Sequence, residues 1–272
     1  MIATIAILSS ICFGLIIGSF FNVLIWRIPR NESIVWPASH CPKCSSPLKP
    51  WHNIPVFSYL FLRGRCRFCN APIAFIYPLV ECATGCAALV IWLYLIRPHL
   101  ILPPAALPGL GLQALFLLLT IPVSIIDIQH YIIPDRFSLS LLGLGVIVSF
   151  LPGYPTPLDT LYGILAGGGS LLLVGWIGTA LLKKGDAMGG GDIKLMAAAG
   201  ALWGPQTALT GIIFGALFGS IIGIALIVRK KLSSEHHIPF GPFLSIGIWV
   251  AVFFGNEIIT IYMDWITALS GG

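Results

Sequence analysis

Long apolar runs follow one another along almost the whole chain, and they restrict it to a membrane fold more than any other feature does. Pro and Gly punctuate the gaps between runs, which cover about residues 2–26, 78–97, 109–127, 133–151, 158–182, 192–204, 206–228 and 239–266. Only 9% of the residues are charged, whereas a soluble domain carries roughly a quarter. About 20 apolar residues suffice to cross a bilayer as a helix. The sequence therefore predicts an all-α polytopic membrane protein with about eight transmembrane helices.

The distribution of Lys and Arg predicts how these helices are oriented. Basic residues crowd residues 27–77, and short basic loops stay in the cytoplasm, so we expect this segment there. Two spans between Lys194 and Arg229 place the basic cluster at 229–231 in the cytoplasm as well. The run 192–204 is shorter than a usual crossing, and we expect a short helix buried in the bundle that turns at Gly204-Pro205.

Three regions follow from this pattern: an N-terminal transmembrane helix (1–26), a polar cytoplasmic insert (27–77) and a multi-helix membrane domain (78–272). The first run has no basic start and no cleavage site, so we expect a retained anchor rather than a signal peptide. The net charge of +5 comes mostly from basic residues in the loops beside the spans. No basic stripe interleaves with aromatic residues, so the expected partner is a lipid bilayer and not nucleic acid.

The insert contains two Cys-x-x-Cys pairs with 21 residues between them: Cys41 with Cys44, and Cys66 with Cys69. Two such pairs at about this separation are typical of structural zinc sites, and four thiolates leave no coordination position open for catalysis. A small insert also needs the metal for part of its folding energy. Disulfides or free thiols are the alternatives, and a reducing cytoplasm disfavours disulfides. His40 and His52 are better explained as surface residues.

Two acidic residues stand out against the apolar background. Asp192 closes the run Gly189–Gly191, and Asp127 ends the apolar run that begins at Leu115. A carboxylate beside membrane-deep sequence is costly and marks a candidate functional site. The orientation places both acids at the cytoplasmic membrane edge on different helices. Two carboxylates that share one proton can hydrolyse a peptide, one as base toward water and the other as acid toward the carbonyl. We therefore interpret them as a candidate catalytic pair.

Simpler roles compete with this interpretation. Asp192 suits an N-cap of a helix that begins at Ile193, and Asp135 competes with Asp127 but follows Pro134 as another expected N-cap. Glu81, just inside a span, is either a helix-start acid or part of a ligand site. Intramembrane acids also occur in ion-coupled transporters, and a zinc-stabilised assembly factor without catalysis is a further alternative.

Several motifs in order resemble the bacterial type IV prepilin peptidases, membrane aspartic proteases with a Gly-x-Gly-Asp motif. They are the segments 18–23 and 27–29, the two cysteine pairs with 53–59 and 63–66 between them, 77–81, 126–127 with 133–135, and 189–194. The resemblance implies cleavage of the short basic leader of type IV prepilins or type II secretion pseudopilins at the cytoplasmic face of the bacterial inner membrane. It also implies that Asp127 and Asp192 are the catalytic acids.

Many members of this family also N-methylate the newly exposed residue with S-adenosylmethionine, so the resemblance implies a bifunctional enzyme. No glycine-rich dinucleotide-type fingerprint is visible for the methyl donor. Asn22 and Glu81 are our candidates for that cofactor site, although Asn22 could equally bond a neighbouring helix. The sequence leaves the particular pilin and the oligomeric state open.

Overall fold

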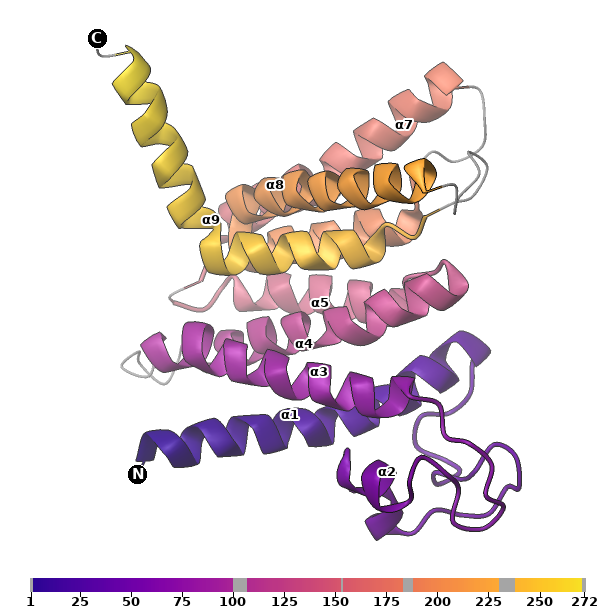
Figure 1. Cartoon of the computed structure of the whole chain (residues 1–272). Coiled ribbons are helices and arrows are strands. Elements are labelled where there is room, and N and C mark those ends of the chain that lie inside the picture. The colour runs from indigo at the N-terminus through magenta and orange to yellow at the C-terminus, as the bar shows by residue number, and fades with distance from the viewer. Residues whose placement is uncertain (1, 100–106, 153, 183–187, 230–237, 271–272) are drawn as a thin grey trace. The chain divides into compact units, whose positions relative to one another are not determined.

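The computed structural model describes residues 2–99, 107–152, 154–182, 188–229 and 238–270, and helices dominate these ranges (Figure 1). Their only β-contacts are two isolated bridges in the insert, His40 with Pro47 and Arg65 with Pro72. The α-helices are α1 Ile2–Arg27, α2 Phe57–Phe61, α3 Ile76–Ile91, α4 Leu107–His130, α5 Asp135–Val148, α6 Pro157–Ile164, α7 Ser170–Leu182, α8 Gly190–Val228 and α9 Gly241–Ser270.

Six helices within the described ranges are long and apolar enough to cross a membrane. They are Ala3–Arg30, Ile76–Ile96, Leu107–His130, Pro157–Leu181, Gly190–Val228 and Gly241–Leu269. This confirms the prediction of an all-helical, multi-pass membrane chain. The two predicted spans outside this set have a structural explanation: α5 has only 14 residues, and the runs 192–204 and 206–228 are two helical parts of α8 that meet at a kink at Gly204 and count as one span. Eight crossings therefore remain a prediction.

The chain divides into two compact units, residues 1–101 with 117–126 and residues 102–116 with 127–272. In the first unit α1 packs against α3 through small residues. A Cβ on Gly14 would lie 2.6 Å from both the Ala88 Cβ and the Thr84 carbonyl oxygen. Without side chains here the two backbones approach closely, which replaces the hydrophobic driving force that is missing between helices in lipid.

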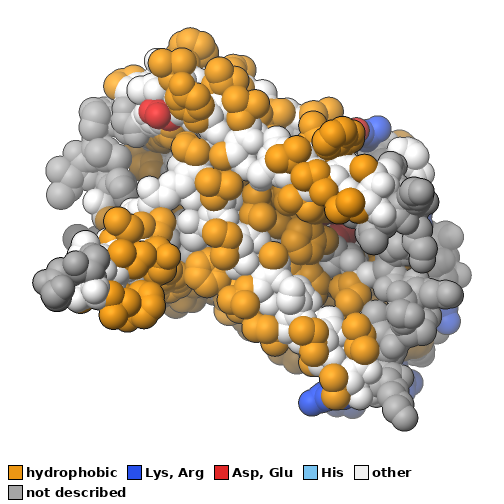
Figure 2. Space-filling view, turned by 90° about the horizontal axis from the view of Figure 1, so that it is seen from above, with side chains coloured by type: hydrophobic (Ala, Val, Ile, Leu, Met, Phe, Trp, Pro, Cys, Tyr) orange, Lys and Arg blue, Asp and Glu red, His pale blue; other side chains and the backbone are white. Residues whose placement is uncertain are grey.

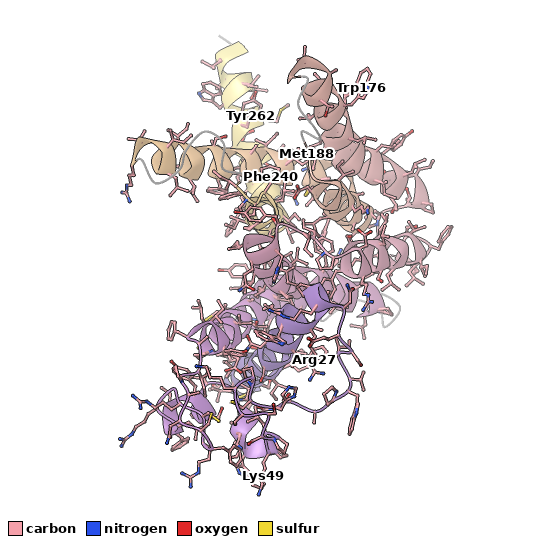
Figure 3. The ribbon with its side chains drawn as sticks, turned by 90° about the vertical axis from the view of Figure 1, so that its right-hand side faces the viewer. Arg27, Lys49, Trp176, Met188, Phe240 and Tyr262 are labelled. Atoms are coloured by element: carbon pink, nitrogen blue, oxygen red, sulfur yellow. The ribbon has the colours of Figure 1, made fainter. Side chains whose placement is uncertain are left out.

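The polar insert connects the end of α1 at Arg27 to the start of α3 at Ile76, close to the predicted bounds of 27–77. Arg27 is a buried anchor of this segment and not only an orienting charge. Its Nη1 donates to the Ser33 carbonyl oxygen at 2.8 Å and its Nη2 to the Pro37 carbonyl oxygen at 2.7 Å. Lys49, by contrast, lies exposed near the outer end of the insert (Figure 3).

In the second unit α8 packs against α5, α6 and α9. Its first part is buried, as predicted for a short helix inside the bundle: Leu195, Met196, Ala198 and Leu202 are at most 2% exposed. Gly163 and Gly200 lie so close that a Cβ on either would collide with the carbonyl oxygen of the other. Small residues thus allow α6 to approach the buried part of α8 closely.

The predicted turn at Gly204-Pro205 is confirmed as a break in α8. Gly204 has φ 82° and ψ −178°, a conformation that only glycine adopts readily. Pro205 has no N–H, so the Ala201 carbonyl oxygen loses its usual helical donor. The Thr160 hydroxyl donates to this oxygen at 3.2 Å instead. The Gln113 amide donates to the neighbouring Leu202 oxygen at 3.3 Å, so side chains satisfy the carbonyls that the break frees.

Hydrophobic side chains cover much of the face seen in Figure 2, and charged side chains on it are few. On α7 the exposed residues include Leu172, Leu173, Val174 and Trp176. The second half of α9 leaves α8 and is also mostly exposed (Figure 1). An outward apolar surface of this kind suits helices surrounded by lipid.

Candidate active site and metal centre

Asp127 lies in the last turn of α4, which ends at His130. The residue is 6% exposed, and the preceding Ile126 is fully buried. The helix ends because Tyr131 adopts a left-handed conformation (φ 57°), and the Tyr131 N–H donates to the Asp127 carbonyl oxygen at 2.8 Å. This C-terminal cap fixes the last turn and with it the position of the Asp127 side chain.

Asp192 lies in the first turn of α8 and is 8% exposed. The helix begins at Gly190, earlier than the predicted start at Ile193, and the extended Gly189 takes the N-cap position. Asp192 is therefore not an N-cap residue. A Cβ on Gly189 would lie 2.7 Å from Asp192 Oδ2, so the glycine makes room for the carboxyl.

The structure brings Asp127 and Asp192 together within the second unit, where the two carboxyls interact electrostatically. Ile133, in the short link between α4 and α5, packs at the start of α8: a Cβ on Gly191 would lie 2.7 Å from the Ile133 Cβ. Two buried acids from separate helices thus lie near the same isoleucine. Such a pair cannot carry two negative charges without a large electrostatic cost.

Gly241 is a member of this site that the sequence analysis did not identify. It begins α9, and its backbone N–H donates to Asp127 Oδ2 at 2.9 Å. Figure 3 labels Met188 and Phe240, which lie just before the starts of α8 and α9. The available signal was the pair Pro239 and Pro242, which flank Phe240-Gly241 at the opening of the last apolar run. Nothing in that signal points to Asp127, which is 114 residues away.

Asp135 forms an ion pair at the edge of the site instead of joining it. It is the first residue of α5, and its Oδ1 lies 2.7 Å from Lys194 Nζ on α8. The two side chains are 57% and 38% exposed. The predicted N-cap role is wrong, because Pro134 occupies the cap position without a side-chain hydrogen bond. The ion pair ties the start of α5 to the first turn of α8.

The two candidates for the methyl-donor site, Asn22 and Glu81, are both buried in the first unit. The Asn22 amide donates to the Tyr77 carbonyl oxygen at 3.1 Å, so it bonds a neighbouring helix. Glu81 lies in the second turn of α3 rather than at its start, and its Oε2 accepts the Val56 N–H at 2.7 Å. A Cβ on Gly18 would lie 2.7 Å from the Glu81 Cα. Polar groups of α1, α3 and the insert thus converge between apolar helices.

The four insert cysteines converge as the zinc prediction requires. Their Sγ atoms all lie within 4.8 Å of one another, and Cys41 Sγ is 3.9 Å from Cys69 Sγ. Tetrahedral zinc with Zn–S bonds of about 2.3 Å requires sulfurs about 3.8 Å apart. The seven cysteines of the chain are all free. The remaining three, Cys12, Cys82 and Cys86, are exposed on their helices.

The two cysteine pairs lie in matching turns. In the first, the Cys41 N–H donates to the Ser46 carbonyl oxygen, and in the second the Cys66 N–H donates to the Ala71 oxygen. Ser45 and Asn70 follow each pair in the left-handed conformation. Hydrogen bonds from the Ser46 side chain and backbone hold the pKa of Cys44 at about 6. Backbone hydrogen bonds from Cys69 and Phe68 lower the pKa of Cys66.

Comparison with known proteins gives consistent matches over nearly the whole chain. Residues 12–95 match the model of the bacterial peptidase A24 N-terminal domain, and residues 114–224 match that of the type IV leader peptidase family. A prepilin leader peptidase/N-methyltransferase of Pseudomonas aeruginosa is 34% identical, covering 95% of this chain and 93% of its own. Proteins of the same name from Aeromonas salmonicida (34%; 93% and 92%) and Burkholderia pseudomallei (34%; 91% and 85%) are similar. No solved structure matches.

Proposed function

The chain belongs to the type IV leader peptidase family, and on that premise we propose that it is a bifunctional membrane enzyme. It removes the short basic leader of type IV prepilins or type II secretion pseudopilins as an aspartic endopeptidase. It then N-methylates the residue that cleavage exposes. The names of its curated relatives support both activities.

The burial of Asp127 and Asp192 beside each other is the observation that carries the peptidase proposal. One carboxylate takes a proton from water as the water oxygen attacks the scissile carbonyl carbon. The other carboxyl gives its proton to the carbonyl oxygen. Burial strengthens both interactions because little water screens them. Backbone N–H and C=O groups at the end of α4 and the start of α8 can form hydrogen bonds with an extended leader, which lipid cannot do.

The proposed topology has eight crossings, with the peptidase acids at the cytoplasmic edge of the bacterial inner membrane. The break at Gly204 supports two passes within α8, and the basic residues of the insert support its cytoplasmic location. A prepilin presents its leader at that membrane edge, so acids at the same depth suit the substrate. In this scheme residues 1–26 anchor the insert 27–77, and residues 78–272 carry the peptidase.

Cys41, Cys44, Cys66 and Cys69 would hold a structural zinc ion in the insert. The convergence of their sulfurs and the matching turns support four-coordinate binding. Bound zinc would supply folding energy that a small segment cannot obtain from its own core.

S-adenosylmethionine would supply the methyl group, and we place its site at the polar cluster of Asn22 and Glu81 in the first unit. The buried Glu81 carboxylate supports this proposal. A charged group among apolar helices is costly, and it therefore marks a candidate functional site. Asn22 orients the start of α3 through the Tyr77 carbonyl.

A purified enzyme incubated with a prepilin, with and without S-adenosylmethionine, tests both activities by mass spectrometry. We expect a shortened product in both samples and one added methyl group only with the donor. Asp127→Asn and Asp192→Asn should each abolish cleavage while the protein still inserts and accumulates. Asp264→Asn, on the exposed part of α9, is the matched control and should cleave normally. Normal processing by both single active-site variants would refute the catalytic pair.

A further inference from the structure

The carboxyl of Asp127 has a hydrogen-bond donor of its own. Gly241 contributes one of the first N–H groups of α9, which have no acceptor within the helix. This N–H points at Asp127 Oδ2 at 2.9 Å, and the bond is buried. A donated N–H stabilises the ionised form of a carboxylate over its neutral form.

One carboxyl oxygen of Asp192 has no such partner among the described residues. This oxygen, Oδ1, is buried. A buried carboxylate oxygen without a donor pays the full cost of lost hydration, whereas a neutral carboxyl pays much less. The two acids therefore differ in their hydrogen bonding, which could not be predicted from the sequence.

Helix dipoles do not remove this difference. Asp192 lies in the first turn of α8, whose positive end favours a negative charge. Asp127 faces the start of α9, whose positive end also favours a negative charge, but it lies in the last turn of α4, whose negative end disfavours one. A direct hydrogen bond to a charged group contributes more than a helix end does, so the bond from Gly241 to Asp127 decides the difference.

We infer that Gly241 is a positioning residue that makes Asp127 the ionised member of the pair and leaves the shared proton on Asp192. The inference rests on the proposed peptidase function and assigns roles within it. Asp127 accepts a proton from water as the new C–O bond forms, and Asp192 gives its proton to the carbonyl oxygen. When the resulting gem-diol collapses, the C–N bond breaks. Asp127 then passes its proton to the leaving nitrogen, and a diol hydroxyl returns a proton to Asp192.

A side chain at position 241 would have to displace a neighbouring side chain. A Cβ on Gly241 would lie 2.7 Å from Asp127 Oδ2, 3.2 Å from its Cγ and 3.1 Å from Ile133 Cδ1. Ile133 also packs on Gly191, next to Asp192. The same isoleucine thus separates the starts of α8 and α9, and a methyl group at Gly241 must displace either Ile133 or the Asp127 carboxylate.

Among the residues that the structure describes, the other charged groups near the pair do not alter the assignment. Asp192 on α8 is the titratable partner of Asp127, and α9 contributes the Gly241 N–H and no charge at this point. On α4 itself His130 is exposed near the helix end. Asp135 of α5 and Lys194 of α8 neutralise each other in their ion pair.

Gly241→Ala tests the inference through the kinetics of prepilin cleavage as a function of pH. Displacing the carboxylate from its donor should lower kcat by about 100-fold with little change in KM, since the leader-binding groups stay intact. The acidic limb of the kcat profile should move to higher pH, because a base without its donor is harder to ionise. Gly255→Ala on the same helix is the matched control: its Cβ would meet only Thr210 Cγ2 at 3.9 Å, and its profile should match the wild type.

A second variant separates the role of the carboxylate from packing. In Gly241→Ala/Ile133→Val the clash with Ile133 Cδ1 is removed, but the clash with Asp127 is not. We expect thermal stability to recover while kcat and the acidic limb do not. Recovery of kcat in the double variant, or an unchanged kcat and profile in Gly241→Ala, would overturn the inference. A wild-type enzyme that cleaves no prepilin would instead refute the proposed function itself.

Discussion

Val56 donates its backbone N–H to the Glu81 carboxylate at 2.7 Å, which joins the insert to a membrane helix. Val56 has φ 63° and ψ −50° and is the centre of a tight turn, in which the Phe57 N–H donates to the Pro55 carbonyl oxygen at 2.6 Å. This conformation costs a β-branched residue about 1–3 kcal/mol. A hydrogen bond to a buried charged group contributes about 1.5–3 kcal/mol, so Glu81 holds the strained turn in place.

Replacing Glu81 should separate this anchoring role from a role in methylation. Glu81→Ala removes the acceptor, and limited trypsin digestion should cut the insert faster than in the wild type. Glu81→Gln keeps an oxygen for the Val56 N–H, so its digestion should match the wild type. We expect methylation to fall in both variants by about 10- to 100-fold, the equivalent of 1.5–3 kcal/mol. Cleavage should persist.

Val56→Gly is the control for this experiment, because glycine adopts the turn without strain and keeps the N–H donor. Its insert should resist trypsin at least as well as that of the wild type. Digestion of Glu81→Ala at the wild-type rate would contradict the anchoring role. Full methylation by Glu81→Gln would show that the methyl-donor site does not need the negative charge of Glu81.

The insert cysteines predict one equivalent of zinc and a measurable loss when it is removed. Cys41→Ser/Cys44→Ser removes both thiolate ligands of the first of the two matching turns. Metal analysis should then find no tightly bound zinc. The insert should become protease-sensitive, and methylation should fall more than cleavage, because the peptidase acids belong to a different unit. Cys86→Ser, at an exposed helix position, should keep its metal. Wild-type zinc content in the double variant would overturn the assignment.

The ion pair between Asp135 and Lys194 should matter little, despite its place next to the site. Both side chains are substantially exposed, and exposed pairs contribute about 0–1 kcal/mol. Lys194→Ala should therefore reduce cleavage by about fivefold at most, the equivalent of 1 kcal/mol. The charge-swapped Asp135→Lys/Lys194→Asp variant should recover part of any loss. A drop as large as that of Asp192→Asn would mean that Lys194 contacts the substrate.

Features that depend on local physics were predictable from the sequence. Asp192 stood out because a charge within an apolar chain is costly, and the break at Gly204-Pro205 follows from backbone chemistry at those two residues. The cysteine spacing predicted a cluster because two Cys-x-x-Cys pairs at this separation have few alternative roles. In each case the information lies within a few residues, or in residue types with few alternative roles.

Features that depend on tertiary contacts were not predictable. Gly241 donates to Asp127 across 114 residues, and a backbone N–H carries no sequence signal. Arg27 looked like an orienting charge, yet it is 7% exposed and holds two carbonyl oxygens of the insert. The helical start at Gly190 moved Asp192 from the expected N-cap into the first turn. Hydropathy alone did not reveal these placements, because they arise when helices pack.

The close contact between α6 and α8 gives a last prediction, about stability. A Cβ on Gly163 would collide with the Gly200 carbonyl oxygen, which belongs to a backbone that cannot rotate away. Gly163→Ala should therefore destabilise the protein by about 1–3 kcal/mol, the usual cost of overpacking. The transition midpoint in detergent should fall. Gly169→Ala, a few residues further along, meets nothing within 4 Å and should unfold at the wild-type temperature or above, because alanine favours a helix. Equal midpoints for the two variants would show that α6 and α8 are not in contact at this point.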